Sequence, residues 1–174
     1  NVAFAGIPED NYEVIENTPY VAIVSKGQFP QHVVINTSDG KILCNSNDAQ
    51  IKGVTNRYIL YETGNILIYG VTSSLGPKVA LFDIATGQIK WAKENLFGKG
   101  LFAEKLQGKP LEAGPDALIA STSGGVYKIN TQTGEQIWKT PLPKMTVQST
   151  TKTDVKLLKS VREGEFYFLF NMYA

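Results

Sequence analysis

A single motif occurs three times in this chain, with a period of 47 residues. Each copy has an asparagine or aspartate four residues before a glycine, and two copies have a tryptophan four residues after that glycine. A fixed period of this length is typical of a repeat architecture. The first copy departs from the pattern at two positions, where it has Asp39 in place of threonine and Cys44 in place of tryptophan. The motif residues are Asn36 and Gly40 in the first copy, Asp83, Thr86, Gly87 and Trp91 in the second, and Asn130, Thr133, Gly134 and Trp138 in the third.

The motif predicts a β-hairpin in each copy. An asparagine or aspartate side chain can bond to nearby backbone N–H groups, and the glycine can adopt a positive φ at little cost. Short β-branched and aromatic segments separated by turn residues surround the motif, so we expect an all-β protein without long helices. An irregular connection with one strand at Leu101–Leu106 is expected between the second and third copies. The other predicted strands are Tyr58–Tyr61, Ile66–Val71, Val79–Ile84, Ala117–Ser121, Val126–Ile129, Asp154–Leu158 and Glu165–Asn171.

Composition excludes several classes of function. The 174 residues are 43% hydrophobic with a net charge of +1, as in an ordinary globular protein. This charge balance gives no overall attraction to nucleic acid or to an anionic membrane surface. No apolar run reaches the roughly 18 residues of a membrane helix. The chain starts with Asn1 and not with Met, so we expect that it begins after a removed segment.

The repeat resembles the tryptophan-docking motif of quinoprotein-like β-propellers of the pyrroloquinoline-quinone type. The residues that carry the resemblance read D-I-A-T-G-Q-I-K-W and N-T-Q-T-G-E-Q-I-W. The resemblance implies four-stranded antiparallel blades, with Trp91 and Trp138 packed against neighbouring blades and a weaker junction at Cys44. It also implies that the motif residues named above have a structural role.

About three and a half such repeats fit the chain. We expect one β-propeller-type region over residues 1–174, with repeats at 1–46, 47–93 and 94–140 and a partial repeat at 141–174. Propellers have four to eight blades. We therefore expect this chain to be part of a larger propeller, completed by further blades or by self-association; a compact domain of three blade-like units is the alternative.

No catalytic, cofactor-binding or metal-binding residue is predicted. One cysteine excludes the pair of adjacent cysteines that stands beside the quinone in many quinoprotein dehydrogenases. Asp83 and Asp154 lack a surrounding cluster of oxygen ligands. His32 has no recognisable nucleophile and is expected at a strand end or on the surface. Asn36-Thr37-Ser38 matches a glycosylation acceptor but is read as turn chemistry, and the basic cluster Lys152–Arg162 is read as a solvated surface.

The sequence therefore favours a non-catalytic propeller scaffold that binds protein partners and neither nucleic acid nor cofactor. The resemblance extends to propellers of bacterial envelopes, which implies a periplasmic, outer-membrane-associated or exported location. Two alternatives stay open: a fragment of a quinone- or metal-dependent oxidoreductase whose active site lies outside this chain, and a sensor-type luminal propeller domain. The expected contact surfaces are Gly98–Pro110, Ser73–Pro77 and Phe29.

Overall fold

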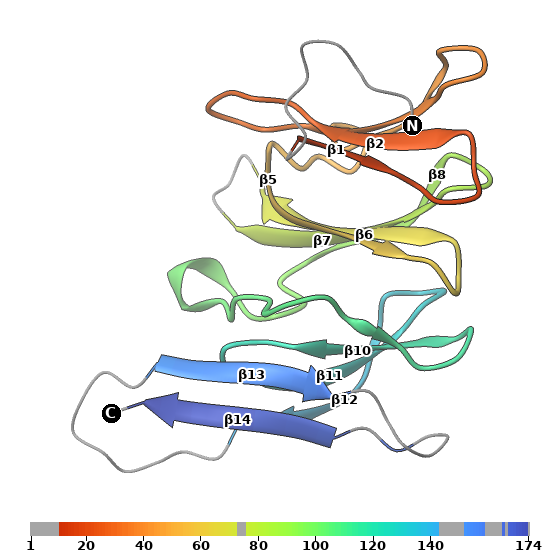
Figure 1. Ribbon diagram of the computed structural model, residues 1–174. Coiled ribbons are helices and arrows are strands. Elements are labelled where there is room, and N and C mark those ends of the chain that lie inside the picture. Colours follow the sequence, from red (N-terminus) through yellow and green to blue (C-terminus); the bar gives the residue numbers. More distant parts are fainter. Residues whose placement is uncertain (1–10, 73–75, 143–151, 159–164, 166, 174) are drawn as a thin grey trace. The chain divides into compact units, whose positions relative to one another are not determined.

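The computed structural model describes residues 11–72, 76–142, 152–158, 165 and 167–173 (Figure 1). The chain divides into two compact units, Asn1–Glu94 and Asn95–Ala174. Among the described residues, no helix has the length and apolar character of a membrane span.

The first unit contains two four-stranded antiparallel sheets whose strands follow one another in chain order. One sheet consists of β1 (Tyr12–Val14), β2 (Tyr20–Val24), β3 (His32–Asn36) and β4 (Ile42–Asn45). The other consists of β5 (Gly53–Leu60), β6 (Asn65–Val71), β7 (Pro77–Asp83) and β8 (Gln88–Glu94).

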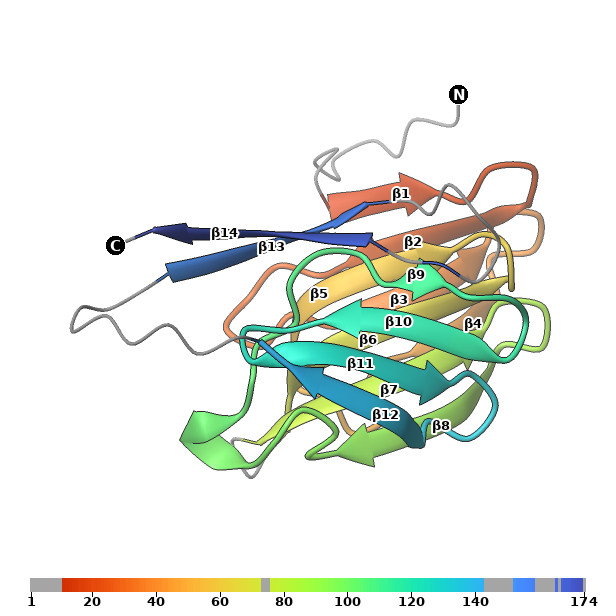
Figure 2. The ribbon, with the colours of Figure 1, turned by 90° about the horizontal axis from the view of Figure 1, so that it is seen from below.

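The second unit repeats this plan once and adds a hairpin. Its four-stranded sheet consists of β9 (Leu111–Glu112), β10 (Ala117–Ser121), β11 (Gly125–Asn130) and β12 (Gln136–Pro141), seen side by side in Figure 2. A separate two-stranded sheet pairs β13 (Lys152–Leu158) with β14 (Tyr167–Tyr173). All four sheets are antiparallel, so the predicted all-β class is confirmed.

The three copies of the sequence motif form the same turn between the third and fourth strands of each sheet. In each, the Asx side-chain oxygen accepts a hydrogen bond from the backbone N–H two residues later, at 2.8–3.0 Å. The glycine N–H donates back to the Asx carbonyl at 2.8–2.9 Å, and the glycine φ is between 68° and 72°. Since this φ is unfavourable for residues with a Cβ, the glycine is required by the turn itself.

A β-bulge follows the turn in every copy. The register shifts by one residue so that Leu43, Lys90 or Ile137 has no partner on the third strand. These positions are again 47 residues apart. The residue directly after the bulge is Cys44, Trp91 or Trp138. A bulge changes the direction of the side chains next to it. The bulge therefore sets which face of the sheet receives the motif side chain.

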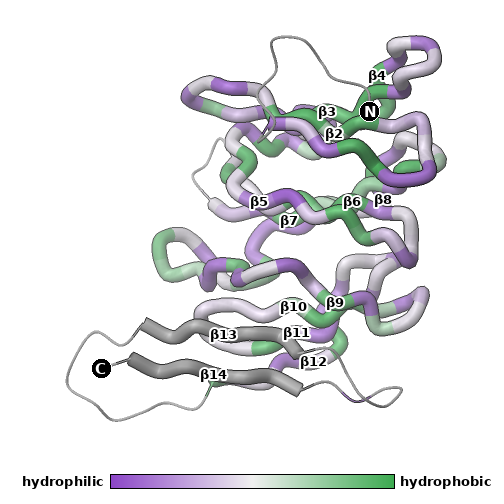
Figure 3. Tube along the Cα trace, viewed as in Figure 1, coloured by the Kyte–Doolittle hydropathy of each residue, from purple (hydrophilic) through white to green (hydrophobic). Residues whose placement is uncertain are grey.

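The core of the first unit lies between its two sheets. Its strands β3 and β6 hold much of the hydrophobic colour in Figure 3. β6 is buried on both faces from Asn65 to Gly70, which explains why its sequence is continuously apolar and does not alternate. The core cluster contains Ile15, Ala22, Val34, Cys44, Ala49, Ile51, Ile59, Ile66, Ile68, Ala80, Phe82 and Ile84.

The expected strand at Leu101–Leu106 is wrong. Gly100–Phe102 forms a short 3-10 helix, η2, and only Leu106 makes an isolated bridge, with Thr122. The Ala103 N–H donates to the Gly100 carbonyl and the Glu104 N–H donates to the Phe97 carbonyl, so these groups bond within the loop and not to a neighbouring strand. β5 is also longer than predicted, running from Gly53 to Leu60.

Candidate interaction surface

The stretch Gly98–Pro110 is a closed loop with an apolar apex. Its neck is formed by the Glu104 N–H, which donates to the Phe97 carbonyl at 2.7 Å. At the apex, Leu101 and Phe102 are 98% and 96% exposed. In Figure 2 the short helical turn that carries them stands clear of the β9–β12 sheet. We call Leu101 and Phe102 the apex.

Both sides of the neck are fixed to the β9–β12 sheet. Phe97 is buried, and its ring meets the Tyr127 ring edge-on with centroids 4.9 Å apart. On the other side, the Lys105 N–H donates to the Ser123 hydroxyl at 3.0 Å and the Ser123 N–H donates to the Lys105 carbonyl at 2.9 Å. The loop thus ends on a buried aromatic contact and on two hydrogen bonds between Lys105 and Ser123.

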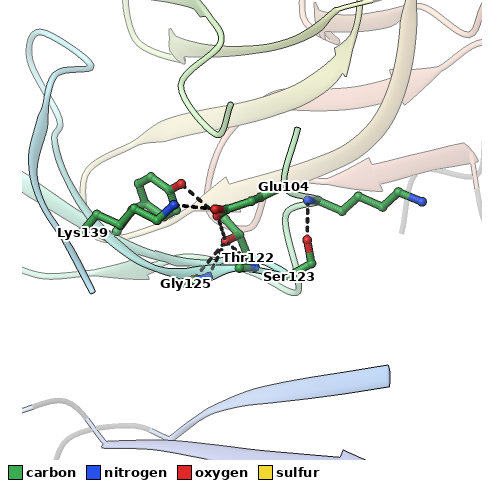
Figure 4. A network of polar contacts seen from close by, with 8 residues as sticks. Glu104, Thr122, Ser123, Gly125 and Lys139 are labelled. Carbon is green, nitrogen blue, oxygen red and sulfur yellow. Dashed lines mark hydrogen bonds and ion pairs between the residues drawn. The ribbon is translucent and has the colours of Figure 1, made fainter. Parts of the chain in front are cut away.

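Glu104 anchors the neck through a network of polar contacts (Figure 4). Its carboxylate accepts hydrogen bonds from the Thr122 hydroxyl at 2.5 Å and the Tyr127 hydroxyl at 2.8 Å. The Lys139 ammonium forms an ion pair with the other carboxylate oxygen and lies 4.9 Å from the centre of the Tyr127 ring. These donors come from the end of β10 and from β11 and β12, so one side chain ties the loop to three elements.

The electrostatics of this network keep Glu104 ionised. Burial acts to raise the pKa of the Glu104 carboxyl, but the hydrogen bonds from Lys139, Thr122 and Tyr127 outweigh it, and the pKa lies below its usual value. The hydrogen bond to Glu104 likewise raises the pKa of Lys139. Gly124 is required here because a Cβ at that position would collide with the Glu104 carboxylate. The negative charge of Glu104 is therefore compensated within the protein, by the Lys139 ammonium and by the hydroxyls of Thr122 and Tyr127.

A second exposed apolar residue, Phe29, lies in the turn between β2 and β3 and is 54% exposed. Gln31 holds this turn, because its amide nitrogen donates to the Lys52 carbonyl at 2.7 Å and to the Phe29 carbonyl at 3.2 Å. The Ser46 hydroxyl donates to the Gln31 amide oxygen at 2.9 Å. The turn presents Phe29 from a fixed backbone. Of the third expected surface, residues 73–75 lie outside the described residues.

The motif side chains do not share one environment. Trp91 is 7% exposed and pairs with Leu81 across the strands, whereas Trp138 is 40% exposed on β12. Cys44 is buried in the core cluster, and burial raises the pKa of its thiol to about 12. The docking roles of the two tryptophans, and the weaker junction at Cys44, stay predictions.

Gly87 shows direct contact between the two sheets of the first unit at the motif. A Cβ placed on Gly87 would lie 3.0 Å from the Leu43 carbonyl oxygen and 3.1 Å from the Leu43 Cβ. Gly40 has nothing within 4 Å of the same position. The second copy of the turn therefore packs on Leu43, the bulge residue of the first copy.

His32 is the first residue of β3 and is fully buried, so the expected surface position is wrong and the strand-end position is right. Neither ring nitrogen has a hydrogen-bond partner, and the ring centre lies 6.0 Å from that of Phe82. Burial lowers the pKa of His32 to about 3, with Arg57 adding to the effect. Sequence reasoning missed this burial because a polar residue beside an apolar strand is normally exposed. Among the described residues, no group of three or more histidine, cysteine, aspartate or glutamate side chains could hold a metal ion.

Four-stranded antiparallel sheets that recur with one turn, one bulge and one motif define a β-propeller repeat protein. A family model described as "Outer membrane protein assembly factor BamB" matches residues 14–168. The chain therefore belongs to this BamB-like family of PQQ-type repeats, which confirms the expected family. None of the curated proteins matches the chain.

Three solved structures that match this chain are each longer than it. Saccharomyces cerevisiae Sqt1 has a TM-score of 0.50 and 22% identity, with 82% of this chain and 34% of that chain covered. BamB from Moraxella catarrhalis has a TM-score of 0.45 and 12% identity, over 77% of this chain and 38% of that one. The β-propeller domain of the Trilobed protease from Pyrococcus furiosus has a TM-score of 0.48 and 9% identity, over 90% of this chain and 51% of that one. The chain thus spans between a third and about half of the length of each structure.

Proposed function

We propose that this chain is a non-catalytic part of a propeller scaffold that binds protein partners in the bacterial envelope. The observation that carries the proposal is the family match over residues 14–168, since the family is described as an assembly factor of outer membrane proteins. An envelope location, periplasmic or associated with the outer membrane, follows from the same description. The repeats 1–46, 47–93, 94–140 and 141–174 form one region of a larger propeller in this proposal.

Two features of the structure support a scaffold. The repeated turn and bulge give each sheet the same rigid edge, and loops between such strands are the usual place for binding residues. Several polar residues have a structural role: Asn36, Asp83 and Asn130 close turns, and Glu104 anchors a loop.

Phe29 is the proposed anchor for a protein partner. An aromatic side chain that is half exposed on a fixed turn can bury a large apolar area at a small entropic cost, because its backbone is already ordered. Close to half of the Phe29 side chain is already covered, so the residues around it can complete a contact area and exclude water.

Affinity capture from the envelope fraction of the source organism tests the proposal. The wild-type chain, Phe29→Ser and the control Asp39→Asn are compared by quantitative mass spectrometry. We expect a defined protein that co-purifies with the wild type and the control and is depleted at least about 10-fold with Phe29→Ser, since losing one buried aromatic contact costs 1.4 kcal/mol or more. A partner set that is unchanged by Phe29→Ser contradicts the assignment of Phe29. If no protein co-purifies with the wild type, the scaffold proposal fails.

A further inference from the structure

The apex differs from the other exposed apolar residues of the described chain. Phe29 and Ile42 keep 54% and 56% of their surface exposed, so nearly half of each is covered by neighbouring groups. Leu101 and Phe102 are exposed almost completely. Two adjacent large apolar side chains that project fully into solvent are an unfavourable arrangement unless something covers them in use.

The apex has few neighbouring side chains within its own loop. Gly98 and Gly100 have no side chains, Ala103 has only a methyl group, and the Lys99 side chain is exposed. A protein contact of standard size needs about 800 Å² on each partner, with a ring of residues that excludes water from the hot spot. Two projecting apolar side chains with few neighbours suit the acyl-chain region of a lipid membrane, which needs no matching shape.

The charges around the apex are positive. Lys99 and Lys105 are exposed within the same loop. The one acidic residue between Gly98 and Pro110 is Glu104, and its carboxylate is engaged by Lys139, Thr122 and Tyr127. Lys99 and Lys105 therefore place positive charge near the apex, which the net charge of +1 for the whole chain does not reveal.

We propose that the apex inserts into the interface of an anionic lipid membrane. Leu101 and Phe102 enter the boundary between headgroups and acyl chains, and Lys99 and Lys105 contact the lipid phosphates. The anchored neck holds the apex clear of the sheet, so that insertion requires no rearrangement of the fold. This contact is independent of a protein partner at Phe29, and it makes the protein peripheral to a membrane without spanning it.

Vesicle co-sedimentation tests the proposal with the full 174-residue chain. The probes are vesicles of phosphatidylcholine alone and of phosphatidylcholine mixed with phosphatidylglycerol. The variants are Leu101→Ser with Phe102→Ser, Lys99→Gln with Lys105→Gln, and Phe29→Ser as a matched apolar-to-serine control. Because the apex side chains are almost fully exposed, the double serine variant is expected to keep the wild-type melting temperature, which circular dichroism checks.

We expect the wild type and Phe29→Ser to bind the anionic vesicles equally and to bind phosphatidylcholine weakly. Removing two lysines should weaken binding about 30-fold, since each basic residue near an anionic surface contributes about 1 kcal/mol. The double serine variant should lose at least about 10-fold, from the apolar area that no longer enters the interface. Equal binding by the wild type and the apex variant, or no binding to either vesicle, overturns the proposal. An apex variant that loses a protein partner but keeps vesicle binding overturns it also, and assigns the apex to protein recognition.

Discussion

Replacing Gly87 with alanine tests the contact between the first two sheets, and Gly40→Ala is its matched control. Both glycines occupy the same position of the repeated turn, with φ of 68° and 72°. Each substitution therefore has the same backbone cost, about 1–2 kcal/mol for a residue with a Cβ in the left-handed region. Reduced entropy of the unfolded chain offsets about 0.4–1 kcal/mol of that cost. For Gly40→Ala, which meets open space, we expect a loss of about 1 kcal/mol in the free energy of unfolding.

Gly87→Ala should cost more because the added methyl meets Leu43. The Cβ would lie 3.0–3.3 Å from the oxygen, Cβ and Cα of Leu43, of which two are backbone atoms. Ordinary contacts between carbon atoms are about 3.5–4.0 Å, so the two sheets must separate slightly. Overpacking of this kind costs typically about 1–3 kcal/mol, which gives about 2–4 kcal/mol in total.

Urea unfolding followed by circular dichroism measures both variants against the wild type. The expected result is an unchanged denaturant slope and a midpoint that falls clearly further for Gly87→Ala than for Gly40→Ala. Equal losses, within about 0.5 kcal/mol, would show that the turn of the second copy does not pack on β4, and the docking interpretation of the motif would be refuted.

Three further predictions concern the motif tryptophans and the buried titratable groups. Trp91→Ala should lower the free energy of unfolding by about 3–5 kcal/mol, measured by the same urea titration. Trp138→Ala should lower it by less, because Trp138 is 40% exposed and Trp91 only 7%. A loss below about 1 kcal/mol for Trp91→Ala would show that the Trp91 ring does not dock. The pKa of His32 is lowered from 6.5 to about 3 on folding, so the unfolded chain binds the proton first and stability falls as the pH drops below about 6.5. Calorimetric unfolding should show a loss of about 2 kcal/mol between about pH 7 and pH 5 that is absent in His32→Phe, and an equal loss in both would contradict it. The Cys44 thiol, with its pKa raised to about 12, should not react with a thiol reagent at neutral pH until the chain unfolds, and rapid labelling of the native protein would be the contrary result.

The features that the sequence predicts best are turns and strands set by residues close to one another in the sequence. The repeated turn needs only an Asx oxygen, a nearby N–H and a glycine with positive φ, all within five residues, and it forms in all three copies. The predicted strand Ile66–Val71 agrees with β6 because isoleucine, tyrosine and valine have a clear β preference and turn residues flank them. The bulge at Leu43, Lys90 and Ile137 was not predicted, because no side chain there differs from that of an ordinary strand.

The candidate surface was predicted only as a stretch of chain. Glycines and lysines mark Gly98–Pro110 as irregular, but the closed neck depends on Phe97 meeting Tyr127, which lies 30 residues later. The network at Glu104 likewise joins residues from three strands or their ends. Such contacts depend on tertiary packing, and the strand expected at Leu101–Leu106 failed for this reason. Likewise, the burial of His32 comes from the packing of two sheets and has no local signal.

In vivo photo-crosslinking at Phe29 tests the central claim, a protein-binding scaffold, most directly. A photoreactive phenylalanine analogue replaces Phe29 in the source organism, and Asp39, in the turn at the other end of β3, is the control position. We predict an adduct with one defined envelope protein that forms at position 29 and not at position 39. A chain that forms no protein adduct at position 29, while the substituted protein folds and accumulates as the wild type does, would contradict the scaffold account.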